Sequence, residues 1–69
     1  MKIFVTNNVL LLRKDKNVTQ EAFAEGIGVS RQTVIAIEKG NYIPSLLLGL
    51  KIAKFFGKRV EEVFIYHEK

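Results

Sequence analysis

The order of polar and apolar residues between positions 19 and 40 predicts two short helices joined by a tight turn. Thr19 favours a helix N-cap. After it, Phe23, Ala24 and Ile27 recur at the spacing of one helix face. Gly28 can adopt the left-handed conformation of a sharp stop, and Ser30 offers a second N-cap directly afterwards. In the second helix Val34 and Ile37 face inward. The pair therefore presents a polar, outward-facing edge at the start of its second helix.

The segments on either side of this pair predict three more helices and two strand-like ends. Helices are expected over about residues 8–16, 45–56 and 60–64, the first capped by Asn8. KIFVT near the start and FIYH near the end are short, β-branched and aromatic, as strands are. The alternative is that both ends are loose tails. Gly26 lies near the end of a predicted helix, where it costs about 1 kcal/mol relative to alanine, and no local pattern explains it.

Composition indicates one small domain of 69 residues. A chain of this length buries only about 60% of its unfolded surface, so it gains stability from association. Its formal charge of +4 suits a polyanionic partner, although many small domains are as basic. The chain has no cysteine and no apolar run of about 20 residues, which excludes a disulfide framework and a membrane span. Polar residues interrupt the first nine positions, unlike a signal peptide, so we expect a cytoplasmic protein.

The run TQEAFAEGIGVSRQTVIAIEKG has the two helices, the glycine-containing turn and the polar second N-terminus of a helix-turn-helix. It resembles the Cro/CI-type, or XRE-type, DNA-binding domain of phage and bacterial repressors, and the similarity covers roughly residues 9–64. The resemblance implies a mainly α, five-helix, lambda-repressor-like domain spanning residues 1–69, with the helix-turn-helix at 19–40. In some small members the chain ends form an antiparallel sheet, which residues 2–6 and 64–67 suit.

In this family the start of the second helix enters the major groove of DNA. Arg31 and Gln32 occupy that position, and Ile35 and Ala36 lie one turn further along. Arginine can bind guanine O6 and N7, and glutamine can bind adenine N6 and N7. A β-branched residue such as Ile35 suits a thymine methyl group. The resemblance thus assigns these four side chains to base contacts, whereas charge and polarity alone fit an ordinary solvated surface.

Phosphate contacts are expected on both sides of that helix. Thr19 and Gln20 lie at a helix N-terminus, whose free N–H groups attract anions. Lys39, Asn41 and Tyr42 surround the other end of the second helix and its following loop. A lysine at a helix C-terminus is also ordinary dipole complementation, and the motif favours the phosphate interpretation.

Two further roles follow from the family pattern. Arg13 and Glu38 occupy positions that the family pairs across two helices, which predicts a structural ion pair. The position of Gln20 in the family also braces the first residue of the recognition helix, here Arg31.

The resemblance further predicts a homodimer, because one domain reads too few bases to locate a site and a twofold dimer reads two half-sites. The helix at 45–56 is apolar nearly all round and must be covered on most sides. The family core accounts for Leu46, Leu50, Ala53 and Phe56. The surplus apolar surface of this helix and the apolar residues that follow it are assigned to the dimer interface: Leu47, Val60, Val63, Phe64 and Tyr66.

Other functions are less compatible with the sequence. His67 is the only histidine and has no clustered ligands, so no metal site, cofactor or small-molecule ligand is expected. Ser30 and Ser45 look like caps without a base nearby, so no catalytic residue is expected and an enzyme is improbable. A protein-interaction module using Leu10, Leu11 and Ile35 remains an alternative. Membrane attachment through LLLGLKIAKFF is disfavoured, because its lysines define no broad polar face.

Overall fold

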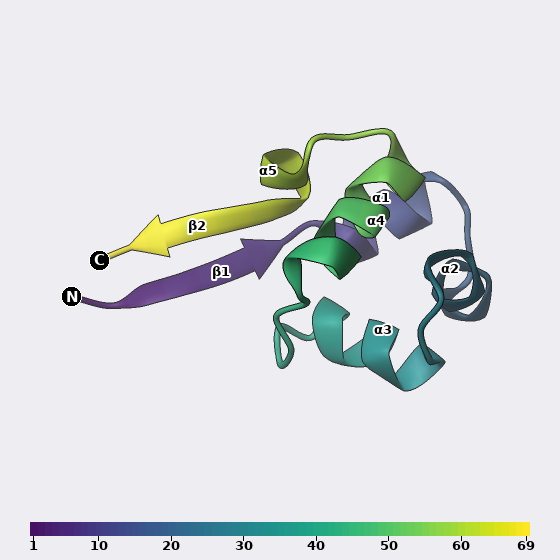
Figure 1. Ribbon diagram of the computed structural model, residues 1–69, viewed down its shortest axis with the longest axis horizontal. Helices are drawn as coiled ribbons and strands as arrows, with labels where there is room; N and C mark the ends of the chain where they lie inside the picture. The colour runs from purple at the N-terminus through teal and green to yellow at the C-terminus, as the bar shows by residue number, and fades with distance from the viewer.

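Five helices and two terminal strands make up the computed structural model, which describes all 69 residues (Figure 1). In chain order the elements are β1 (Ile3–Asn7), α1 (Val9–Asp15), α2 (Gln20–Ile27), α3 (Arg31–Glu38), α4 (Leu46–Phe56), α5 (Val60–Val63) and β2 (Phe64–Glu68). The expected mainly α, five-helix fold is therefore confirmed. None of the helices has the length and apolar character that crossing a membrane requires.

The chain ends pair as a two-stranded antiparallel sheet, with Ile3 opposite Glu68 and Asn7 opposite Phe64. The sheet extends away from the helices, and both termini lie at its far end (Figure 1). This extension runs along the longest dimension of the molecule, 37 Å against 23 and 21 Å for the other two. The predicted terminal sheet is confirmed, and the alternative of two loose tails was wrong.

Side-chain caps begin most of the helices. The hydroxyl groups of Thr19, Ser30 and Ser45 each accept a hydrogen bond from the backbone N–H three residues later, at 3.0, 3.2 and 3.2 Å. These bonds satisfy donors that the first turn of a helix leaves free. The first helix differs from expectation, because Asn8 makes no side-chain cap bond. Instead, Oδ1 of Asn7 accepts from the first N–H of α1 at 3.1 Å, and Asn7 Nδ2 donates to the C-terminal turn of α3.

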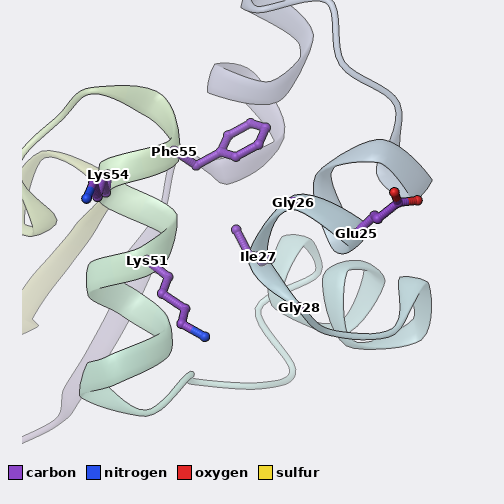
Figure 2. A pocket seen from close by; sticks show the side chains of 7 residues that line it. All are labelled: Glu25, Gly26, Ile27, Gly28, Lys51, Lys54 and Phe55. Atoms are coloured by element: carbon purple, nitrogen blue, oxygen red, sulfur yellow. The ribbon is translucent and has the colours of Figure 1, made fainter.

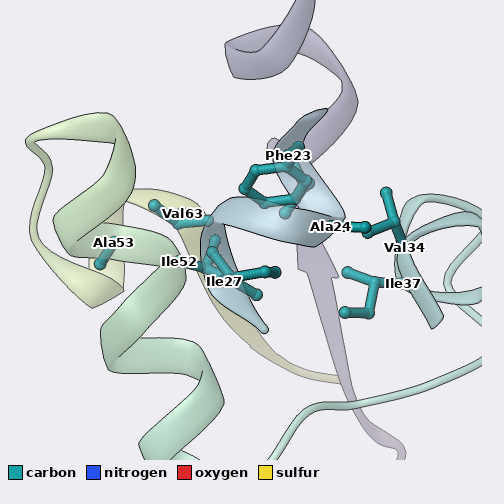
Figure 3. Packing of buried hydrophobic residues seen from close by; sticks show 9 residues of the cluster. Phe23, Ala24, Ile27, Val34, Ile37, Ile52, Ala53 and Val63 are labelled. Carbon is teal, nitrogen blue, oxygen red and sulfur yellow. The ribbon is translucent and has the colours of Figure 1, made fainter. Parts of the chain in front are cut away.

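One apolar core joins the five helices (Figure 3). Its buried side chains are Val9, Phe23, Ala24, Ile27, Val34, Ile37, Ile52, Ala53 and Val63. On α4 the buried stripe consists of Gly49, Ile52 and Ala53. Leu46 and Leu50 are 73% and 49% exposed, so their assignment to the core was wrong. Leu46 instead lines a shallow depression together with Val60 and Phe64.

Gly26 allows α2 to approach α4 closely. A Cβ atom at this position would lie 2.7 Å from Cε2 of Phe55, which is closer than carbon atoms can pack. The Phe55 ring is held by Phe23 and Phe56, with centroid distances of 5.0 and 5.3 Å. Long-range packing therefore accounts for the glycine that no local pattern explained.

Candidate nucleic-acid interface

The turn between α2 and α3 sets the direction in which α3 faces. Gly28 ends α2 with φ of +76°, a left-handed conformation that side chains with a Cβ rarely adopt. Ser30 then starts α3 at once. Because Val34 and Ile37 on α3 are buried against α2, the opposite side of α3 faces outward. In Figure 1 α3 lies along the lower edge of the helical body.

The four candidate base-contacting residues share this outward side. Arg31 and Gln32, the first two residues of α3, are exposed, and Ile35 and Ala36 are half-buried one turn later. The two polar side chains therefore project from the start of the helix. The two apolar side chains lie one turn further along the same side and project less. This is the disposition that a helix needs to place polar groups against base edges in a major groove.

A shallow depression of about 390 Å³ adjoins these residues, between α3 and the loop that follows it. Gln32 and Ala36 line one side, and Asn41 and Tyr42 line the other. Thr33 also lines it, with its hydroxyl group 3.0 Å from that of Ser30. Neither hydroxyl group was anticipated as part of the site. The i, i+3 spacing of a capping serine and a threonine is the signal that identifies such a pair.

Arg13 and Glu38 form an ion pair beneath α2 and α3. Arg13 Nε donates to Glu38 Oε2 at 2.6 Å, and Arg13 Nη2 donates to Oε1 at 3.3 Å. The two side chains are only 10% and 5% exposed. A third donor, Arg13 Nη1, binds the carbonyl oxygen of Val18 at 2.9 Å. The pair thus connects α1, the start of α2 and the end of α3, with its buried charges hydrogen-bonded.

Gln20 links this ion pair to the surface. Its Nε2 donates to Glu38 Oε1 at 3.0 Å, and its Oε1 accepts from Arg31 Nε at 3.3 Å. The contact between Gln20 and Arg31 corresponds to the brace that the family resemblance implied. The bond from Gln20 to Glu38 was not anticipated, because it joins residues from different helices that no sequence spacing connects.

The candidate phosphate-contacting residues lie at both ends of α3. At the Arg31 end, Thr19 is the exposed N-cap of α2, with its hydroxyl group already used as the cap acceptor. The groups it leaves free are the first backbone N–H groups of α2, which carry the positive end of the helix dipole. At the other end, Lys39 and Asn41 are exposed, and Tyr42 is 43% exposed.

The candidate dimer residues divide into three groups by their exposure. Leu47 and Tyr66 are 67% and 61% exposed, and Val60 and Phe64 are half-buried beside an apolar depression of about 140 Å³. Val63 is fully buried in the core, so its assignment to the interface was wrong. Val63 lies on the side of α5 that packs against the core. A hydrogen bond to Glu68 raises the pKa of the Tyr66 phenol.

The largest depression, about 430 Å³, lies elsewhere, between the end of α2 and α4 (Figure 2). Lys51, Lys54 and Glu25 stand around it, and in Figure 2 Glu25 points away from the two lysines. These groups do not converge on a common point, as a ligand site requires. No group of three or more metal-ligating side chains is present. His67 stacks on Phe4 and its Nε2 lies 2.8 Å from Thr6 Oγ1, which accounts for the lone histidine.

Comparison with known proteins agrees with this geometry. The helix-turn-helix family model matches residues 9–63, which includes all five helices. The chain belongs to the XRE-type helix-turn-helix family. A relative from Methanocaldococcus jannaschii, an uncharacterized HTH-type transcriptional regulator, is 56% identical over 62 residues, covering 90% of this chain and 94% of the relative.

Two further relatives extend the comparison. The cryptic phage CTXphi transcriptional repressor RstR of Vibrio cholerae is 42% identical over 52 residues, covering 75% of this chain and 47% of the repressor. The crystal structure of the restriction-modification controller protein C.AhdI from Aeromonas hydrophila is similar, with a TM-score of 0.74 and 31% identity, covering 80% of this chain and 83% of that one. The chain is therefore a transcriptional regulator with a helix-turn-helix DNA-binding fold, and its relatives are regulators rather than enzymes.

Proposed function

We propose that this chain binds double-stranded DNA sequence-specifically and represses transcription as a homodimer on a palindromic operator. The observation that carries the proposal is the placement of Arg31 and Gln32, both exposed at the start of α3. Arg31 binds guanine O6 and N7, and Gln32 binds adenine N6 and N7, each contact contributing about 1–3 kcal/mol of discrimination. Ile35 and Ala36 contact the groove floor behind them, where a thymine methyl group fits an apolar side chain.

Phosphate contacts hold α3 in the groove from both ends. The first N–H groups of α2, next to Thr19 and Gln20, bind a phosphate on the Arg31 side. Lys39, Asn41 and Tyr42 bind the backbone on the far side, where the depression beside α3 brings Asn41 and Tyr42 close to Gln32. These contacts fix the register of the protein on DNA and carry no sequence information themselves.

Dimerisation supplies the second half-site. A single α3 reads three or four base pairs, too few to specify one site in a genome. A twofold dimer reads two half-sites about 34 Å apart, so its operator is palindromic. The apolar surface around Leu47, Val60, Phe64 and Tyr66 remains uncovered in one chain, and a patch of this kind marks an interaction site. Repression is supported by the relative RstR, a transcriptional repressor.

The direct test is to select bound sites from random duplex DNA and to measure the mass of the protein in solution. We expect an enriched palindrome with half-sites one helical turn apart and a sedimentation mass of two chains. Recovery of no preferred sequence contradicts sequence-specific binding, and a non-repeated short site with a monomeric mass contradicts the dimer.

Two leucines allow a matched test of the interface. Leu47 is 67% exposed on α4 and Leu11 is 66% exposed on α1, outside the proposed surface. Leu47→Lys places a charge in the interface and should shift the protein towards monomer at micromolar concentration, whereas Leu11→Lys should leave it dimeric. Equal effects of the two substitutions would refute the proposed surface.

The second candidate function, a protein-interaction module, rests on the exposure of Leu10 and Leu11, at 42% and 66%. Under this hypothesis Leu11→Lys abolishes binding of a protein partner, and DNA affinity is absent or insensitive to salt. A DNA affinity that falls steeply with salt favours the first function instead.

A further inference from the structure

We infer that the buried Arg13–Glu38 ion pair positions Arg31 for base contact, acting through the side-chain amide of Gln20. The four residues form a continuous chain of hydrogen bonds, which we call the Arg13–Arg31 relay: Arg13 donates to Glu38, Gln20 donates to Glu38, and Arg31 donates to Gln20. The consequence for DNA rests on the proposed function. The hydrogen-bonded relay itself is a property of the protein alone.

The orientation of the Gln20 amide is the central step. An ionised carboxylate only accepts hydrogen bonds, and a guanidinium only donates them. Gln20 lies between the Glu38 carboxylate and the Arg31 guanidinium, so only one of its two amide orientations satisfies both neighbours. In that orientation the amide oxygen faces Arg31. Rotating the amide by 180° would place its NH₂ group against the Arg31 Nε–H and break both bonds.

Burial decides which end of the relay is fixed. Arg13 and Glu38 are 10% and 5% exposed, and Arg13 is also tied to the Val18 carbonyl just before α2. Gln20 is half-buried, and Arg31 is exposed. Mobility is therefore lowest at the ion pair and greatest at Arg31, so the ion pair orients Gln20, and Gln20 in turn restrains Arg31. Arg13, Glu38 and Gln20 are positioning residues, while Arg31 alone of the four contacts a base.

The restraint leaves Arg31 suited to a guanine. Its Nε–H is used by Gln20, and no other residue of the chain accepts from its two terminal Nη groups. These Nη groups are free to donate to guanine O6 and N7. Because a preorganised side chain loses less rotamer freedom on binding, the relay should raise affinity and discrimination at that base pair about threefold to tenfold.

The relay is tested first without DNA, by measuring the ¹⁵N order parameter of the Arg31 Nε–Hε bond. Arg13→Met combined with Glu38→Leu removes the ion pair without leaving a buried charge, a replacement that folded proteins often tolerate. Gln20→Met removes only the middle link. Thr33→Val is the control, because it removes a hydroxyl contact on the same helix outside the relay. We expect a lower Arg31 order parameter in the first two variants and an unchanged one in the control.

A wild-type order parameter for Arg31 in the folded double variant would overturn the inference. If that variant does not fold, Arg13→Leu combined with Glu38→Met gives the same test with a different apolar packing at the two positions. An Arg31 order parameter that stays at the wild-type value in this variant overturns the inference equally.

The second measurement uses the selected DNA site, with each half-site base pair substituted in turn. The base pair read by Arg31 is the one at which Arg31→Ala abolishes discrimination, and Gln32→Ala identifies its neighbour in the same way. Gln20→Met should lower discrimination about threefold to tenfold at the Arg31 base pair and leave it unchanged at the Gln32 base pair. Equal losses at both would show a merely structural role. If the wild-type protein selects no site, the proposed function fails, and the order parameters still decide the relay.

Discussion

Replacing Gly26 with alanine has two opposing effects on stability, a gain in helix propensity and a steric clash with Phe55. Gly26 lies inside α2, where alanine is favoured over glycine by about 0.8–1.0 kcal/mol on helix propensity alone. In the folded chain, however, the new methyl carbon would lie 2.7 Å from Phe55 Cε2 and 3.2 Å from Cδ2. The Phe55 ring cannot turn aside freely, because the rings of Phe23 and Phe56 and the ammonium group of Lys16 pack around it.

The magnitudes predict the sign of the effect. Forcing a methyl group into a well-packed core costs about 1–3 kcal/mol. Subtracting the propensity gain of about 1 kcal/mol leaves Gly26→Ala destabilising by about 1 kcal/mol, within a range of roughly 0–2. Phe55→Leu removes the carbon that lies closest. In that background the same substitution should stabilise the protein, because the propensity gain remains while the clash is relieved.

The assay is urea unfolding followed by circular dichroism, with all variants at one protein concentration, since association alters apparent stability. Gly49→Ala is the matched control, because a Cβ there would make an ordinary contact, 3.7 Å from Val60 Cγ2. We expect it to leave stability unchanged or to raise it by up to about 1 kcal/mol. Stabilisation by Gly26→Ala in the wild-type background, or equal effects with Phe55 and with leucine, would refute the steric explanation.

Two further substitutions separate the roles of charged residues. Lys39→Ala should weaken binding to all DNA sequences alike and reduce the slope of log affinity against log salt by about one unit, as measured by fluorescence anisotropy at several salt concentrations. Glu38→Ala leaves Arg13 buried without its partner and should lower the free energy of unfolding by about 3–5 kcal/mol in urea titrations, and a loss below 1 kcal/mol would mean that the pair is effectively solvated.

The sequence was sufficient for features that depend on local chemistry. Thr19, Ser30 and Ser45 were identified as caps because a short side-chain oxygen before an apolar-periodic run can bond the first free N–H groups. Gly28 was identified as a helix stop because glycine, which has no Cβ atom, readily adopts the left-handed conformation that a sharp stop requires. The terminal strands were recognisable because Ile3, Phe4, Val5, Ile65 and Tyr66 are too apolar for solvated tails.

The errors occurred where burial depends on neighbours distant in sequence. In α4 almost every position is apolar, so periodicity did not show that Leu46 and Leu50 lie outside the core. In α5 a single turn did not show that Val63 faces inward. The contact of Gly26 with Phe55 and the bond from Gln20 to Glu38 likewise join separate helices. No spacing within one element predicts such contacts.

The placement of Arg31 and Gln32 at the exposed start of α3 is tested most directly by the ratio of affinities for selected and scrambled duplexes, measured in competition gel shifts at one salt concentration. Arg31→Ala combined with Gln32→Ala should reduce this ratio to near one while the circular dichroism spectrum stays unchanged. Lys39→Ala should weaken both affinities and preserve the ratio. A double variant that folds and keeps the wild-type ratio would show that α3 does not read the bases.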